Sequence, residues 1–364
     1  MLQNFSVRRF FKLVRRQGAE RYLLEVLLSF ALSVSLTRFY LSVTGYPQLG
    51  GGEMHIAHAL WGGLLLFIAA LLPLLLSNRR VYSISAIIAG IGVGLFIDEV
   101  GKFLTKTNNY FYPAAAPIVY TFFILAILIF LRYKRPPHID DHAELCRALE
   151  DVQEFLHHPF GTNYREAIEK RLAYIAQNLE SGAHARLALQ LLDFVRADER
   201  PVPIVRLTWH QRVLNRISHW MTAEREKVFL IMGLALLGIV AFKNPAKVLL
   251  ARWISPSNII EKILSITFGR HIEITASLEM SNVRVILELI VGTIFLVSVI
   301  LLLLRQNKTG VILAFTGLFI YFTSANILVF YFEQFSTIIM VAIQFAVLLG
   351  LIDYQRRISR IRST

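Results

Sequence analysis

Two histidines and two adjacent acids stand at the ends of long apolar runs. His55 and His58 lie in GEMHIAHALWGG, where one run begins, and Asp98 and Glu99 lie in GIGVGLFIDEVGKFL, where the next run ends. Side chains spaced three residues apart share one face of a helix. Imidazole and carboxylate groups bind zinc, and a bound metal ion lowers the pKa of its water. The pattern predicts His55, His58, Asp98 and Glu99 as ligands of a divalent metal such as zinc, with His58, Asp98 and Glu99 as catalytic groups.

The same residues fit two other hypotheses. Arg38 and Lys102 lie in the first and third apolar runs and would support the site, because either cation can neutralise an acid in a buried ion pair. Charged groups inside a membrane cost about 2.5–3.5 kcal/mol each on insertion scales, so they face one another or a water-filled cavity. Ionisable residues among spans also form proton and ion paths. A structural ion pair and a transport path therefore stand beside the metal site.

The composition is typical of a membrane protein. Of 364 residues, 55% are hydrophobic and 17% are charged, and the mean hydropathy is +0.54. Soluble domains have about 45–50% apolar and about 25% charged residues. The net charge of +13 comes from basic clusters beside apolar runs, which suits contact with anionic lipid. We expect membrane lipids as partners and no nucleic acid, since the sequence has no nucleic-acid-binding motif.

About eight apolar runs are long enough to cross a bilayer as helices, which takes about 20 residues each. They cover residues 22–43, 55–77, 82–104, 114–131, 228–242, 283–304, 309–331 and 335–353. The fifth run is cut short by Lys243 and Pro245, and we expect it to continue as a kinked helix towards Trp253. The predicted fold class is therefore an all-α, polytopic transmembrane helical bundle.

The basic residues predict the orientation of these spans. Short loops rich in Lys and Arg stay in the cytoplasm. Basic clusters at 8–16, 79–80, 132–135, 305–308 and 356–362 all fall on one side of alternating spans. Both termini should therefore be cytoplasmic, in the cytoplasmic (inner) membrane of a bacterium or archaeon.

The chain divides into three predicted domains. The first is an N-terminal membrane domain of four spans at 1–132, and the last is a C-terminal membrane domain of four spans at 228–364, with a long outer loop at 243–283. Between them, residues 133–227 form a cytoplasmic helical domain that is a candidate for binding a protein partner.

The cytoplasmic domain shows helical spacing of apolar residues at 143–155, 164–179 and 184–195. A basic, Trp-bearing amphipathic helix is predicted at 205–220. Such a helix lies on a membrane surface or packs on its own bundle, and the sequence leaves both open.

The candidate site residues are expected at one depth. His58 lies one turn inside the second span from His55, about 4.5 Å deeper, and the acid pair lies about 8–9 Å below the outer end of the third span. The glycines at 90, 92 and 94 allow a neighbouring helix to approach closely. We expect a polar pocket open to the outer face. Asn326 in the seventh span either completes this pocket or bonds neighbouring helices.

Residues 55–112 carry a resemblance to a known group of proteins. HIAHALWGG, then GIGVGLFIDEVGKFL and an aromatic loop, resemble uncharacterised prokaryotic polytopic integral membrane proteins in which a histidine-led span precedes a glycine-rich span ending in Asp-Glu. The resemblance touches His55, His58, Asp98 and Glu99 and implies no activity. From the residues, the expected function is a metal-dependent hydrolase or transferase acting on lipid-linked substrates; the alternatives are an ion- or proton-coupled transporter and a structural or partner-binding membrane protein.

Overall fold

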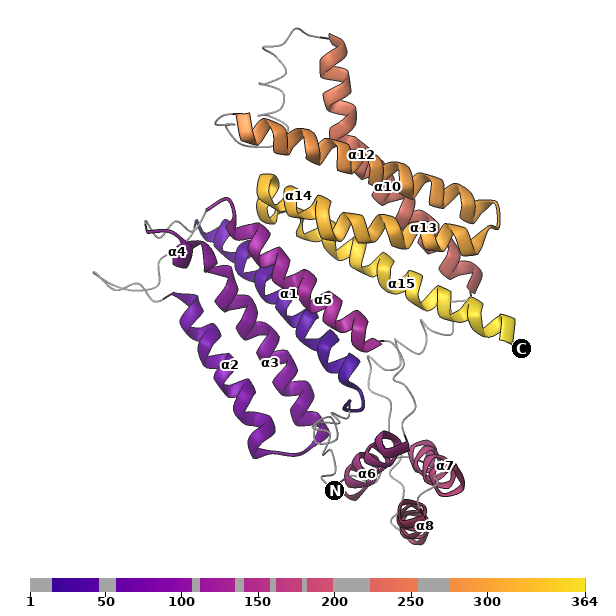
Figure 1. Cartoon of the computed structure of the whole chain (residues 1–364). Helices are drawn as coiled ribbons and strands as arrows, with labels where there is room; N and C mark the ends of the chain where they lie inside the picture. The colour runs from indigo at the N-terminus through magenta and orange to yellow at the C-terminus, as the bar shows by residue number, and fades with distance from the viewer. Residues whose placement is uncertain are drawn as a thin grey trace, which may run out of the picture. The chain divides into compact units, whose positions relative to one another are not determined.

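The chain is built from helices. The structure, a computed structural model, describes residues 15–45, 57–106, 112–134, 141–157, 162–178, 182–198, 223–254 and 275–363, and every regular element within these ranges is a helix (Figure 1). Eight of the helical segments have the length and apolar composition needed to cross a membrane. The predicted all-α, polytopic helical bundle is confirmed.

The predicted spans correspond to observed helices, in most cases extended by a few residues. The spans are α1 (Ala19–Thr44), α2 (His58–Leu75), α3 (Arg79–Asp98), α5 (Ala115–Lys134), α10 (Ala223–Ile254), α12 (Thr275–Leu303), α13 with α14 (Asn307–Ile320 and Asn326–Glu333), and α15 (Ile338–Ser363). The expected third span is divided, because α3 ends at Asp98 and the short helix α4 (Val100–Leu104) follows Glu99.

Helix extends into both ends of the predicted outer loop at 243–283. As expected, α10 passes through Pro245 and reaches Ile254. Helix α12 begins at Thr275, so the chain is already helical before residue 283, where the sixth predicted span starts. Residues 255–274, the middle of the loop, lie outside the described part of the chain.

Contacts divide the chain into two compact units. The first unit comprises Met1–Ser33, Leu60–Gly94 and Ala126–Thr208, and the second comprises Val34–Ala59, Leu95–Leu125 and Trp209–Thr364. In the second unit, α12 packs against α10 and α13, and α15 packs against α10 and α13 (Figure 1). The second unit also holds the predicted site residues that the structure describes.

In the first unit, the glycines of α3 allow two neighbouring helices to approach closely. A Cβ atom on Gly94 would lie 2.7 Å from the Cβ of Ser33 on α1, and one on Gly92 would lie 2.9 Å from the carbonyl oxygen of Gly62 on α2. The Ser33 hydroxyl uses this proximity to donate a hydrogen bond of 3.1 Å to the carbonyl of Ile91. The expected role of the glycine run is therefore confirmed.

Three helices of the first unit form a separate bundle. Helices α6 (Asp141–His157), α7 (Thr162–Asn178) and α8 (Gly182–Ala197) match the three predicted there and pack on one another (Figure 1). Their shared core is apolar and includes the fully buried residues Leu172 and Val195. The amphipathic helix predicted at 205–220 lies outside the described residues.

The close contact at Gly94 leads to a stability prediction. Gly94→Ala places a methyl group against Ser33 and should lower the free energy of unfolding by about 1–3 kcal/mol, the usual cost of overpacking. Gly63→Ala is the control, because no atom lies within 4 Å of a Cβ at Gly63. We expect the unfolding midpoint of the detergent-solubilised protein to fall for Gly94→Ala only. Equal midpoints for the two variants would contradict tight packing of α1 on α3.

Candidate functional site: a buried cluster of charges

Five of the six predicted site residues come together in the second unit. They come from the latter part of α1 (Arg38), the first residue of α2 (His58), the last residue of α3 (Asp98), the turn that follows it (Glu99) and α4 (Lys102). The sixth, His55, lies outside the described residues. The expectation that the first three spans bring these charges to one place agrees with the described geometry.

Arg38 and Asp98 form the most buried ion pair of this cluster. The Nε of Arg38 donates to Oδ1 of Asp98 over 2.5 Å, and its Nη2 donates to the backbone carbonyl of Asp98 over 3.0 Å. The two side chains are 9% and 0% exposed. The Arg38 guanidinium also lies 3.9 Å from the ring centroid of Phe335, a cation–π contact. Arg38 is therefore held by charge, by hydrogen bonds and by an aromatic face.

His58 lies between the two carboxylates. Its Nε2 is 3.2 Å from Oδ2 of Asp98, and its Nδ1 is 2.9 Å from Oε1 of Glu99. A neutral imidazole carries a hydrogen on only one of its two nitrogens. For both contacts to be hydrogen bonds, either His58 is an imidazolium or one of the two acids is protonated. The geometry of the three groups therefore suits one shared proton.

Lys102 completes the cluster on the side of Glu99. Its Nζ donates to Oε1 of Glu99 over 3.1 Å. The other carboxylate oxygen of Glu99, Oε2, is buried and has no hydrogen-bond partner within the described part of the chain. The two cations and the two carboxylates balance, so the net charge of the five groups is set by whether the His58 centre carries its proton.

The break between α3 and α4 explains how neighbouring acids reach the same imidazole. Glu99 has φ −88° and ψ 7°, the bridge region between helix and strand, where many active-site residues lie. In a continuous helix, successive side chains point about 100° apart. The turn at Glu99 changes this direction, and both carboxylates contact His58. Both acids are almost fully buried, while His58 and Lys102 are 19% and 23% exposed, so these two form the outer part of the cluster.

The observed arrangement does not suit a metal ion. No group of three or more His, Cys, Asp or Glu side chains within the described ranges is placed to hold one. The reason lies in the contacts: Arg38 and His58 face the oxygens of Asp98, and Lys102 and His58 face Oε1 of Glu99. The metal hypothesis for His55, His58, Asp98 and Glu99 stays a prediction, and its second histidine is not described.

The sequence reasoning missed a second buried charge cluster. Arg284 and Glu288 on α12 form an ion pair of 2.9 Å, and both are almost fully buried. Glu288 also accepts a hydrogen bond of 3.1 Å from Asn244 on α10, and Arg284 donates to Glu333 at the end of α14. An opposite-charge pair spaced four residues apart at the start of an apolar run was the available signal.

Asn326 forms hydrogen bonds to neighbouring helices, which is one of the two roles expected for it from the sequence. Its Nδ2 donates to the hydroxyl of Tyr120 on α5 over 2.9 Å and to Oε1 of Gln344 on α15 over 2.7 Å. Asn326 follows η2 (Tyr321–Ala325), a π-helical turn, and the Tyr120 hydroxyl donates to the carbonyl of Phe322 in that turn over 2.9 Å. This polar network is buried and uncharged.

Removing the carboxylate of Asp98 tests the ion pair. Asp98→Asn leaves the Arg38 guanidinium buried without its counter-charge, which should lower the free energy of unfolding by about 3–5 kcal/mol. The double variant Arg38→Met with Asp98→Leu should recover most of this loss, because it removes both buried charges. Chemical unfolding in mixed micelles measures both. A single variant as stable as the wild type would contradict a buried ion pair between Arg38 and Asp98. A double variant less stable than the single one would contradict the cost assigned to the unpaired charge of Arg38.

The uncharged network makes a separate prediction. Asn326→Leu removes hydrogen bonds to Tyr120 and Gln344 and leaves buried polar groups unsatisfied, at a cost of about 1–3 kcal/mol. Thr323→Val is the control, since the Thr323 side chain is partly exposed and its hydroxyl bonds the carbonyl of Phe319, one turn earlier in the same span. The measurement is the unfolding midpoint in detergent. An equal change in both variants would rule out the network as a specific helix contact.

Comparison with known proteins finds no relative of this chain. No family model, no curated protein and no solved structure matches it. The resemblance of residues 55–112 to prokaryotic membrane proteins therefore stays a prediction.

Proposed function

We propose that this protein is a proton-coupled membrane transporter in which His58, Asp98 and Glu99 form the proton-binding site. The observation that carries the proposal is the position of the imidazole, with each ring nitrogen within 3.2 Å of a carboxylate oxygen. Ionisable residues among membrane spans are costly, and proton relays in transporters are built from such residues.

The cations next to the acids favour a proton over a metal ion as the ligand. Arg38 and Lys102 already supply positive charge to Asp98 and Glu99, and a divalent ion there would have to displace them. A proton needs no coordination shell and fits between His58 and either acid. Gain or loss of this one proton changes the charge of the whole cluster, which is the property that a coupling site requires.

A change of protonation has a direct mechanical consequence. When the centre is protonated, both imidazole contacts are hydrogen bonds, and the start of α2 is held to the turn between α3 and α4. When the proton leaves, one ring nitrogen and the carboxylate oxygen facing it both present lone pairs, and they repel each other. Proton binding therefore favours the closed arrangement of α2 against this turn, and proton release favours its opening.

Two interrupted helices support transport rather than a purely structural cluster. Transporters place their ion and substrate sites at discontinuous membrane helices. Here α3 breaks at Asp98 and Glu99, and the α13–α14 segment contains the π-helical turn η2 beside the buried Asn326 network. Single π-turns inside helices are frequent at functional sites. We place the charge cluster on the outer side of a bacterial or archaeal cytoplasmic membrane, with both termini cytoplasmic, because the basic loops predict that orientation.

Electrical measurements on reconstituted protein test the proposal. A sudden drop of external pH should produce a transient charge displacement in proteoliposomes on a solid-supported membrane, because the His58 centre takes up a proton. His58→Asn and Glu99→Gln should each reduce this signal at least about tenfold, as expected when a relay residue is lost. A panel of solutes, added under a pH gradient, should then identify one that drives a sustained proton flux, read with a pH dye inside the vesicles.

Controls separate loss of function from loss of structure. Glu166→Gln changes an exposed acid on α7 and should leave the signals unchanged. Unfolding midpoints of the His58→Asn and Glu99→Gln proteins show whether the fold persists. Retention of the full transient in both variants would disprove proton binding at this site. A transient that depends on His58, with no solute driving sustained flux, would disprove transport.

A further inference from the structure

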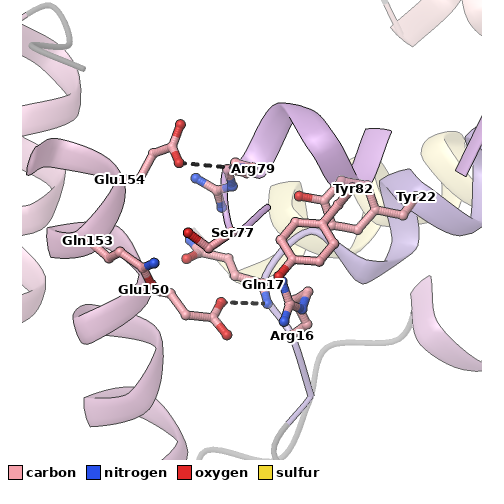
Figure 2. A pocket seen from close by; sticks show the side chains of 9 residues that line it. All are labelled: Arg16, Gln17, Tyr22, Ser77, Arg79, Tyr82, Glu150, Gln153 and Glu154. Atoms are coloured by element: carbon pink, nitrogen blue, oxygen red, sulfur yellow. Dashed lines mark hydrogen bonds between the residues drawn. The ribbon is translucent and has the colours of Figure 1, made fainter. Parts of the chain in front are cut away.

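A polar pocket lies in the first unit, away from the His58 cluster in sequence. It encloses about 260 Å³ between the residues just before α1, the turn from α2 to α3, and one face of α6 (Figure 2). Gln17 lies two residues before the first residue of α1, Ser77 lies in the turn between α2 and α3, and Arg79 is the first residue of α3. These residues lie at the ends of helices long enough to cross a membrane, where lipid headgroups are expected.

Two arginines supply positive charge to the pocket. The guanidinium of Arg16 lies 3.8 Å from the ring centroid of Tyr82, and Tyr82 is within 5.9 Å of Tyr22, ring to ring. Arg79 donates from Nη1 to the hydroxyl of Tyr164 over 3.3 Å. Burial raises the pKa of the Tyr164 hydroxyl, which therefore keeps its proton. Arg16 is thus positioned by the ring of Tyr82, and Arg79 by the Tyr164 hydroxyl and by Oδ1 of Asp151, 3.8 Å from its Nη1. Both arginines are drawn at the pocket in Figure 2.

Two carboxylates on α6 supply the opposite charge. Glu150 and Glu154 are spaced four residues apart, so they share one face of the helix. Glu150 accepts a hydrogen bond of 3.3 Å from the backbone nitrogen of Gln17, and Glu154 accepts one of 3.4 Å from the backbone nitrogen of Arg79 (Figure 2). These bonds bring both carboxylates against the span ends. The lining of the pocket therefore carries both signs of charge, from the arginines and from α6.

We propose that this pocket binds a phosphate group and a primary ammonium group joined by a short linker, as in the headgroup of a zwitterionic aminophospholipid. Arg16 and Arg79 would bind the phosphate, because guanidinium donors match phosphate oxygens. Glu150 and Glu154 would bind the ammonium. An anionic headgroup without an amine would leave both carboxylates facing negative charge. The volume is several times the ~30 Å³ that one water occupies, which leaves room for such a headgroup.

Lipid binding by the full chain tests the proposal. Native mass spectrometry of delipidated protein, titrated with phosphatidylethanolamine or phosphatidylglycerol, gives an apparent Kd for each lipid. We expect phosphatidylethanolamine to bind at least about tenfold more tightly, which corresponds to about 1.4 kcal/mol. Glu150→Gln should remove most of that preference, while Arg16→Gln should weaken the binding of both lipids, because both carry the phosphate. Free phosphoethanolamine, added as a competitor, distinguishes the sources. Displacement of the lipid at similar concentrations assigns the site to a soluble ligand, and no displacement assigns it to the lipid.

Matched variants make the test specific to the pocket. Arg80→Gln removes a cation next to Arg79 in sequence that does not line the pocket, and Glu166→Gln removes an exposed acid on α7. Both should keep the preference for phosphatidylethanolamine. The proposal is overturned if Arg80→Gln weakens binding as much as Arg16→Gln, or if phosphatidylglycerol binds as tightly as phosphatidylethanolamine to the wild type. This experiment is independent of proton binding at His58.

Discussion

The contact between Arg38 and Asp98 is the constraint around which the charge cluster is built. An ionised side chain buried among apolar helices costs several kcal/mol unless an opposite charge meets it with good geometry. Arg38 meets both the carboxylate and the backbone carbonyl of Asp98, which is fully buried. This contact joins the latter part of α1 to the end of α3. The other charged groups of the cluster lie around this contact. They are Glu99 in the turn after α3, His58 at the start of α2, and Lys102 on α4.

The segment at the end of α14 touches both charge clusters of the second unit. Phe335 lies over the Arg38 guanidinium, while Phe332 lies 5.8 Å from that of Arg284 and Glu333 accepts a hydrogen bond from it. Gln334, between them, has φ of 52°, a left-handed conformation that costs energy for a residue other than glycine. Strain of this kind persists only where neighbouring contacts hold it. The two charge clusters are therefore linked through four consecutive residues.

The protein stabilises buried polar groups in two different ways. In the clusters of Arg38 and Arg284, ion pairs offset the cost of burying charge. The network of Asn326 is neutral, and its hydrogen bonds join helices without any dependence on charge. Glycine supports the packing elsewhere, since small residues on α3 let α1 and α2 approach its backbone.

The sequence alone determined the class of the protein and the approximate spans, because a helix rises about 1.5 Å per residue and needs about 20 apolar residues to cross a bilayer. It could not show which groups pair across helices. Arg284 sits near the start of its apolar run and its role with Glu333 was missed, because that contact depends on the rotation of α12 about its axis. The contacts of His58 depend likewise on the break after Asp98, which no spacing rule predicts. Only the tertiary structure decides such pairings, since they join residues that are distant along the chain.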